Sequence, residues 1–158
     1  VDNASWSWGS IGTVMTGADG DFSPTAPASS LIDLVYALPA EYRVSGSFVM
    51  NSRTAAAIRK VKDSEGRFLW SDGYAQGEPA RLLGHRVLIA EDMPDIATGS
   101  LSVAFGDFSS AYTIAERPDL RILRDPFSAK PHVLFYATKR VGGGVTDFGA
   151  IKLLQFSA

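Results

Sequence analysis

The chain has 158 residues, of which 46% are hydrophobic and 20% charged, the composition of one ordinary globular domain. Its formal net charge of −2 argues against a dedicated nucleic-acid binder, because such proteins neutralise many phosphates with Lys and Arg. The absence of cysteine excludes disulfides, thiolate catalysis and cysteine-based zinc sites, and it fits synthesis in a reducing cytoplasm.

A helix is predicted over residues 28–38. Its apolar positions recur at i, i+3, i+4 and i+7, which makes one stripe facing a core; they are Leu31, Leu34, Val35 and Leu38. Pro39 is expected to end or kink this helix, because proline lacks the amide proton and clashes with the preceding turn. Ahead of the helix, an extended segment with Trp6 and Trp8 is expected to pack against the domain.

The central stretch, residues 48–89, predicts a strand, a helix and a second strand. A buried strand at Phe48–Met50 leads into Asn51, whose short side chain suits a helix N-cap. The helix that follows is expected to end near Asp63, and a strand over 86–90 comes after a glycine-punctuated segment. Residues 101–105 predict a half-buried strand, because Leu, Val and Phe alternate with Ser and Ala. We expect the helices to pack on a sheet of these strands.

A loop over residues 91–99 is indicated by its Pro, Gly and acidic content. Its three carboxylates, Glu91, Asp92 and Asp95, raise the alternative of a metal site or an acid/base pair. A solvated loop is the favoured interpretation, because neither His85 nor His132 is near in sequence and no metal-ligand spacing is met.

The last third of the chain is rich in predicted strands. Residues 112–123 are expected to continue a meander with a turn at Pro118–Asp119, and 124–131 to be irregular and bounded by prolines. Residues 132–141 and 150–156 predict two strands of one hairpin, with Gly142–Gly144 as a flexible tip between them.

Several short motifs, in this order and spacing, resemble the major capsid proteins of Hong Kong 97-type tailed phages, and in particular those of alphaproteobacterial gene transfer agents (GTAs), which package cellular DNA in phage-like heads. The motifs are Phe48–Asn51, Lys62–Asp63, Gly66–Leu69, Gly77–Val87, Ala90–Asp95, Ala104–Phe108 and the stretch from Arg121 to Gly144. The resemblance covers nearly the whole chain.

This resemblance implies an α+β fold of the Hong Kong 97 type. Residues 20–123 would form the axial domain, and residues 1–19 and 124–158 would be segments of the peripheral domain. The family's N-terminal arm, extended loop and long spine helix would lie upstream of Val1. Without the spine helix, apolar residues of the C-terminal strands are expected to lose part of their cover; these are Val133, Phe135, Leu153, Leu154 and Phe156.

The implied function is structural. The protein would self-assemble into pentamers and hexamers of an icosahedral shell that encloses DNA without sequence-specific binding, in a virion or phage-like particle made in a bacterial cytoplasm. Two segments would contact neighbouring subunits: a loop near the capsomer axis with Asp92, Met93, Pro94 and Asp95, and a loop near the local three-fold axes with Arg124, Asp125 and Lys130.

We expect no catalytic residue, cofactor, metal or membrane partner. Some members of the family form an isopeptide cross-link that needs an Asn and a Glu, but the matching positions here hold Lys130 and an uncharged residue near Ala137. No apolar run approaches the roughly 18 residues of a membrane span. The alternative function is a small soluble hydrolase or ligand-binding domain, with His85 or His132 as base. The sequence has no Gly-x-Ser-x-Gly motif beside them, and a deep apolar cleft with convergent polar groups would favour this alternative.

Overall fold

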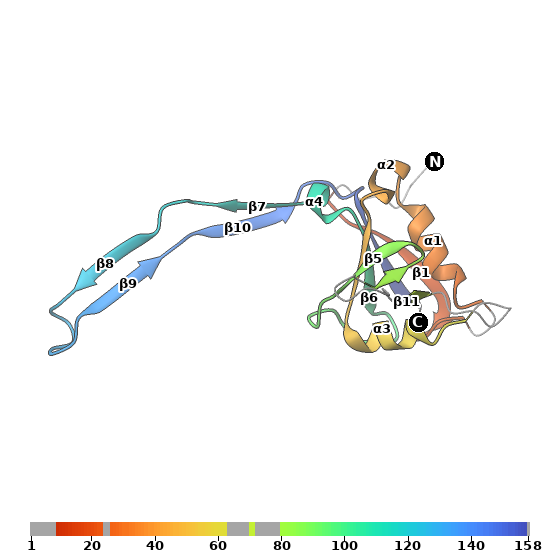
Figure 1. Cartoon of the computed structure of the whole chain (residues 1–158), viewed down its shortest axis with the longest axis horizontal. Coiled ribbons are helices and arrows are strands. Elements are labelled where there is room, and N and C mark those ends of the chain that lie inside the picture. Colours follow the sequence, from red (N-terminus) through yellow and green to blue (C-terminus); the bar gives the residue numbers. More distant parts are fainter. Residues whose placement is uncertain (1–8, 24–25, 63–69, 72–79, 158) are drawn as a thin grey trace. The chain divides into compact units, whose positions relative to one another are not determined.

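The computed structural model describes residues 9–23, 26–62, 70–71 and 80–157 (Figure 1). The chain divides into two compact units, which we call the sheet unit (residues 1–111 and 147–158) and the ribbon unit (residues 112–146). The predicted role of Trp6 and Trp8 and the motifs at 63–69 and 77–79 lie outside the described residues.

The sheet unit is a seven-stranded mixed sheet with helices, which confirms the predicted α+β class. The strand order is β1-β11-β6-β2-β5-β4-β3; β1 is parallel to β11 and β2 to β5, and the other pairs are antiparallel. Its strands are β1 (Gly12–Asp19), β2 (Ser47–Met50), β3 (Trp70–Ser71), β4 (Arg81–Leu82), β5 (His85–Ile89), β6 (Leu101–Gly106) and β11 (Ile151–Ser157). Its helices are α1 (Ser29–Ala37), α2 (Ala40–Arg43), α3 (Ser52–Arg59) and α4 (Phe108–Ala111). None of the helices in the described residues is long and apolar enough to cross a membrane.

One face of this sheet carries the main core. Phe48 lies opposite Phe105 on β6 and Val87 on β5, so the three side chains share that face. Leu34 of α1 and Ile58 of α3 belong to the same buried cluster, which confirms that both helices pack on the sheet. Each such fully buried side chain contributes about 1.5–3 kcal/mol relative to an exposed one.

The centre of β6 is buried on both faces, so the prediction of a half-buried strand was wrong. Ser102 and Ala104, which were expected on the solvent-exposed face of the strand, are 0% and 5% exposed. The Ser102 hydroxyl donates to the Asp95 carbonyl oxygen at 2.9 Å, so its burial leaves no unpaired hydroxyl proton. A strand flanked by two neighbours, β11 and β2, has no open edge, and alternation alone does not reveal what covers its second face.

Helix α3 begins where the sequence predicts and ends earlier. Asn51 is its N-cap, and the side chain accepts a hydrogen bond from the Thr54 amide at 2.7 Å. The helix ends at Arg59 rather than near Asp63. The Lys60 and Val61 amides bond to carbonyls three residues back, at Ala57 and Ile58, which tightens the last turn into 3₁₀-type geometry.

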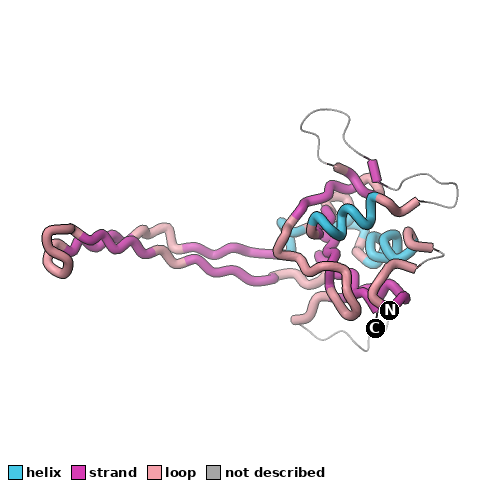
Figure 2. Tube along the Cα trace, turned by 90° about the horizontal axis from the view of Figure 1, so that it is seen from below, coloured by secondary structure: helices cyan, strands magenta, loops and turns pink. Residues whose placement is uncertain are grey.

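The ribbon unit consists of two antiparallel strand pairs, which follow one another along the ribbon; the two strands of each pair run side by side (Figure 2). β7 (Tyr112–Glu116) pairs with β10 (Val141–Val145), and β8 (Arg121–Asp125) pairs with β9 (Leu134–Thr138). The predicted meander was wrong, because β7 and β8 pair with later strands and not with each other. The predicted C-terminal hairpin was also wrong: Gly142–Gly144 lie inside β10, and β11 belongs to the sheet unit.

The expected loss of cover at the C-terminal strands is correct only for the ribbon unit. Val133 and Phe135 are 40% and 66% exposed, because a two-stranded ribbon has no second layer in its own unit. Leu154 and Phe156 are 0% exposed, because β11 lies between β1 and β6 with its apolar face toward α1. The division into an axial domain and peripheral segments stays a prediction, since the two units are defined by contacts within one chain and not by a capsomer axis.

A tyrosine–carboxylate contact inside the sheet unit gives a pH-dependent prediction. The Tyr42 hydroxyl donates to Asp147 Oδ2 at 2.7 Å, and this bond, with the Gly149 amide, lowers the pKa of Asp147. A carboxyl whose pKa is lower in the folded state stabilises the fold above its unfolded pKa of about 4 and loses that effect as the pH falls through its folded value. We expect Tyr42→Phe to lower the Tm at pH 7, with a smaller difference at pH 3. Circular dichroism melts at both pH values check this; an equal difference at both would contradict it.

Candidate functional site: two predicted subunit-contact segments

The first predicted contact segment is the loop between β5 and β6, and its ends are fixed to the sheet. The Ala90 amide donates to the Met50 carbonyl at 2.9 Å, and the Gly99 amide to the Phe156 carbonyl at 2.8 Å. The Ser100 hydroxyl accepts from the Ala97 amide at 3.0 Å. The loop predicted over residues 91–99 is thereby confirmed and has a defined conformation.

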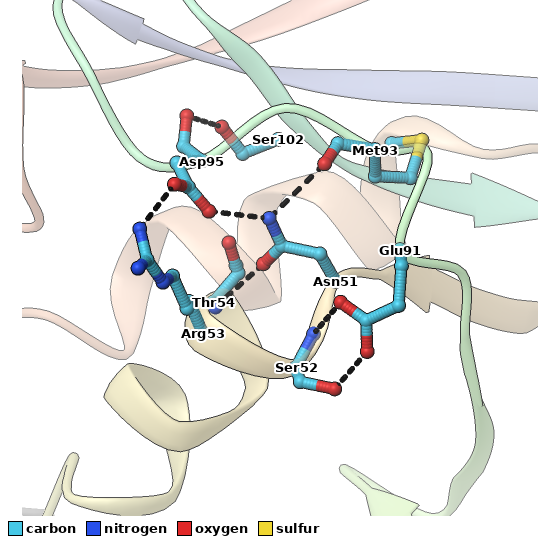
Figure 3. Close-up of polar contacts among 8 residues, drawn as sticks. All are labelled: Asn51, Ser52, Arg53, Thr54, Glu91, Met93, Asp95 and Ser102. Atoms are coloured by element: carbon cyan, nitrogen blue, oxygen red, sulfur yellow. Dashed lines mark hydrogen bonds and ion pairs between the residues drawn. The ribbon is translucent and has the colours of Figure 1, made fainter.

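Asn51 ties the middle of this loop to the start of α3, as Figure 3 shows. It is 4% exposed. Its Nδ2 donates to the Met93 carbonyl at 3.0 Å and to Asp95 Oδ1 at 2.7 Å, while its Oδ1 caps the helix. All three bonds come from one buried amide, so one side chain fixes both the helix start and the loop.

The acidic residues of the loop differ in how they are used. Asp95 Oδ2 also forms an ion pair with Arg53 Nη1 at 2.8 Å, and because both side chains are exposed, this pair contributes little to stability. Glu91 accepts hydrogen bonds from the amide and the hydroxyl of Ser52 (Figure 3). Asp92 has no such side-chain partner among the described residues. Two of the three carboxylates therefore satisfy donors of the fold, and no group of three potential metal ligands occurs in the described part of the chain.

The second predicted contact segment is the tip of the ribbon unit between β8 and β9. Asp125 accepts hydrogen bonds from the Phe127 amide at 2.9 Å, the Ser128 amide at 3.2 Å and the Ser128 hydroxyl, which forms a compact turn. The Ser128 hydroxyl, followed by the Phe127 amide, lowers the pKa of Asp125 below its ordinary value. Phe127 is 79% exposed, an apolar side chain that this turn holds in solvent.

The structure places the predicted residues in two groups. Asp92, Met93, Pro94 and Asp95 lie together in the sheet unit, and Arg124, Asp125 and Lys130 lie in the ribbon unit. Arg124 stands opposite Phe135 on β9, and both Arg124 and Lys130 are exposed. Contact of either group with another subunit stays a prediction.

The two histidines have different surroundings. The His85 ring packs edge-on against Phe105 with centroids 4.9 Å apart, and burial lowers its pKa while a hydrogen bond with the Gly46 backbone opposes that shift. His85 borders a hollow in which no described residue is a serine or an acid; the other lining residues are Ile32, Val35, Tyr36, Arg43 and Leu83. His132 lies in the ribbon unit, where its backbone amide donates to Ala129. Among the described residues that line the hollow, His85 therefore has no Ser, Asp or Glu beside it of the kind that a hydrolase base uses.

A cluster of arginines in the ribbon unit was missed by the sequence analysis. Arg117, Arg121 and Arg140 line a hollow together with Asp119 and Thr138. Register brings them together: the Arg117 amide donates to the Arg140 carbonyl at 3.0 Å, and Arg121 pairs with Thr138. Only the pairing of strands about 20 residues apart reveals the cluster, so no local motif signals it.

Comparison with known proteins shows one consistent family. The model of the Phage capsid family matches residues 3–156. Two solved structures, "Capsid of empty GTA particle computed with C5 symmetry" and "Capsid of native GTA particle computed with C5 symmetry", are each 68% identical with a TM-score of 0.83; the match covers 100% of this chain and 54% and 53% of those chains. A structure titled "Gordonia phage Cozz" matches at 16% identity and a TM-score of 0.52 over 94% of this chain and 50% of that chain, a likeness of fold alone. No curated protein matches significantly. The chain spans about half the length of the solved chains it matches.

Proposed function

Because the chain belongs to the phage capsid family, we propose that it is part of a major capsid protein that self-assembles into the pentamers and hexamers of an icosahedral shell. The shell encloses DNA without sequence-specific binding, in a phage or a GTA particle. The protein is made in a bacterial cytoplasm and functions in the particle wall.

The observation that supports this proposal most is the 68% identity with capsid chains of GTA particles over the whole of this chain. At that identity, about two thirds of the residues of this chain are the same as in those capsid chains. The mechanism is interface geometry: many modest contacts per subunit act together, so the shell is stable although each contact is weak.

Hydrogen bonds within the chain support a choice among the residues of the two predicted contact segments. Asp92 is the candidate of the first segment, since Asp95 and the Met93 carbonyl already bind Asn51. At the ribbon tip, Arg124 and Lys130 are exposed, whereas Asp125 holds the turn. We therefore expect Asp92 and Lys130 to contact other subunits directly, and Asp95 and Asp125 to shape the segments that carry them.

Electron microscopy of the full-length protein, expressed with its neighbouring genes, tests the proposed function. Closed shells built of pentamers and hexamers are expected. A full-length protein that stays soluble and unassembled at high concentration, with its neighbours present, would contradict it.

We also expect the assembled shell to be free of covalent cross-links between subunits. Lys130 at the ribbon tip and Ala137 on β9 supply neither the amide nor the carboxylate that the isopeptide reaction needs. Purified particles heated in dodecyl sulfate should run as a single monomer band on a denaturing gel. A ladder of multimers that survives this treatment would show a cross-link through other residues.

The alternative, a small hydrolase or ligand-binding domain, has less support. Besides His85, the hollow is lined by three apolar side chains and by Arg43 and Tyr36. The Arg43 guanidinium lies 4.5 Å from the centroid of the Tyr36 ring, and its Nη2 donates to the Leu38 carbonyl at 2.9 Å. A hydrolase base acts on a nucleophile or an attacking water oriented by a second group, and no described residue that lines this hollow is a Ser, Thr, Cys, Asp or Glu.

A further inference from the structure

The arginine cluster of the ribbon unit has more positive charge than its own unit neutralises. Arg117, Arg121 and Arg140 surround one carboxylate, Asp119, and all four residues are exposed. Within the described residues, none of the four side chains has an ion pair; the nearby Lys139 is paired with Glu116 at 2.7 Å. The hollow thus has three guanidinium groups for a single acid, and room for another anion.

Charge is also divided unevenly between the two units. Residues 112–146 contain six Lys and Arg against three Asp and Glu, a net charge of +3. The rest of the chain contains nine against fourteen, a net charge of −5. The overall charge of −2 conceals this division. Two copies of the chain therefore present surfaces of opposite sign to each other, which favours contact between the ribbon unit of one copy and the sheet unit of the next.

The three arginines indicate which kind of anion would bind in this hollow. Its planar guanidinium donates two parallel hydrogen bonds to a carboxylate or a phosphate, and it keeps its charge at every physiological pH. Arg117 and Arg140 lie on the two opposite sides of the ribbon, which are joined there by a backbone hydrogen bond between these two residues. An anion in the hollow can therefore be bound from both sides.

We propose that Arg117, Arg121 and Arg140 form a carboxylate-binding site for a second copy of this chain, filled by an Asp or Glu side chain from the sheet unit of a neighbouring subunit. This inference rests on the proposed function, because it requires that copies meet in an assembly. It gives the ribbon unit an electrostatic contact distinct from the one predicted for its tip.

A second copy is a better occupant than nucleic acid. Binding to the DNA backbone requires many cations, and the ribbon unit has a net charge of only +3. Asp119 lines the hollow and repels any anion there, so a single mobile side chain, which can enter beside it, fits better than a phosphate fixed in a large, rigid polymer. The acid-rich sheet unit supplies such side chains in every copy.

Charge reversal in the full-length protein tests the site. We expect Arg121→Glu with Arg140→Glu to raise the protein concentration needed for assembly about tenfold or more, because like charges then face each other at the contact. The matched control is Lys60→Glu with Arg86→Glu, two exposed cations of the sheet unit, which should assemble at nearly the wild-type concentration. Circular dichroism melts of each variant exclude a folding defect.

The conservative variant Arg121→Lys with Arg140→Lys identifies the partner. It keeps the charge and supplies amines that a carbodiimide couples directly to a carboxylate in contact. In particles mixed from ¹⁵N-labelled and unlabelled protein, mass spectrometry should find links between copies, from residue 121 or 140 to an acid in residues 1–111 or 147–158.

Each other result has a distinct meaning. Wild-type protein that fails to assemble contradicts the proposed function itself. Normal wild-type assembly with an unaffected reversal variant, an equal defect in the control, or links confined to one copy overturns the carboxylate site alone. A reversal variant that forms normal shells but loses its DNA content also overturns it, because the arginines would then face DNA.

Discussion

Gly106→Ala is expected to destabilise the sheet unit by about 3 kcal/mol or more. A Cβ atom at this position would lie 2.3 Å from the Ala150 carbonyl oxygen and 2.7 Å from Ile151 Cα. Both are backbone atoms of the neighbouring strand region, where Gly106 pairs with Ile151. Relief requires β6 and β11 to separate, which adds lost ladder hydrogen bonds to the overpacking cost. The free energy of unfolding of a whole domain is roughly 5–15 kcal/mol, so this substitution would remove a large part of it.

Gly142→Ala is the matched control. Gly142 is also a strand glycine, but a Cβ atom there meets nothing within 4 Å. The change should leave stability within about 0.5 kcal/mol, or raise it slightly by restricting the unfolded chain. Urea unfolding followed by circular dichroism gives both free energies; equal values for the two variants would contradict the close approach at Gly106.

The sequence predicted what is decided locally. Asn51 was identified as the cap of α3 because a capping side chain needs only its own first-turn amides. The loop after Ile89 was found from its composition, and α1 from its apolar repeat. The family resemblance, which extends over many short motifs, supplied the fold class that these local signals did not define.

Strand pairing could not be predicted, because it depends on residues far apart in the chain. β1 is parallel to β11 across about 140 residues, and nothing near either strand indicates its partner. Gly142–Gly144 gave the same local signal as a flexible turn. In the structure, a Cβ on Gly143 would lie 2.6 Å from the Tyr112 hydroxyl oxygen, so at this position glycine leaves room for a cross-strand ring.

In the candidate contact loop, too, contacts between residues far apart in the chain could not be predicted from the sequence. Its acidic residues were correctly placed in one loop, but their division of roles was not predictable, because it depends on α3 and the loop meeting in space. Asp95 Oδ1 lies 2.7 Å from Nδ2 of Asn51, a residue 44 positions earlier in the chain. This contact with Asn51 is what gives Asp95 a different role from that of Asp92. The arginine cluster depends in the same way on pairing between β8 and β9.

The Asn51 contact leads to a pH-dependent prediction. Asn51→Asp keeps the oxygen that caps α3, and negative charge at a helix N-terminus is favourable. It also replaces the amide that donates to Asp95 and the Met93 carbonyl with a carboxylate, 2.7 Å from Asp95 Oδ1 and almost fully buried. Repulsion between two buried carboxylates and two lost hydrogen bonds should cost about 3 kcal/mol at pH 7.

The sign of the pH dependence follows from the new carboxyl. Burial beside Asp95 raises its folded-state pKa above the unfolded value of about 4, so its destabilising effect is smallest below pH 4 and grows as the pH rises through the folded pKa. Urea unfolding at several pH values from 4 to 8 measures this. Adding Asp95→Asn to Asn51→Asp should restore part of the stability at pH 7, and Asn51→Ser, which keeps the cap without a charge, should show a loss independent of pH. If the loss of stability for Asn51→Asp were the same at pH 4 and pH 8, Asp95 would not face this position in solution. There would then be no reason to propose that Asp95 stabilises the loop while Asp92 contacts a neighbouring subunit.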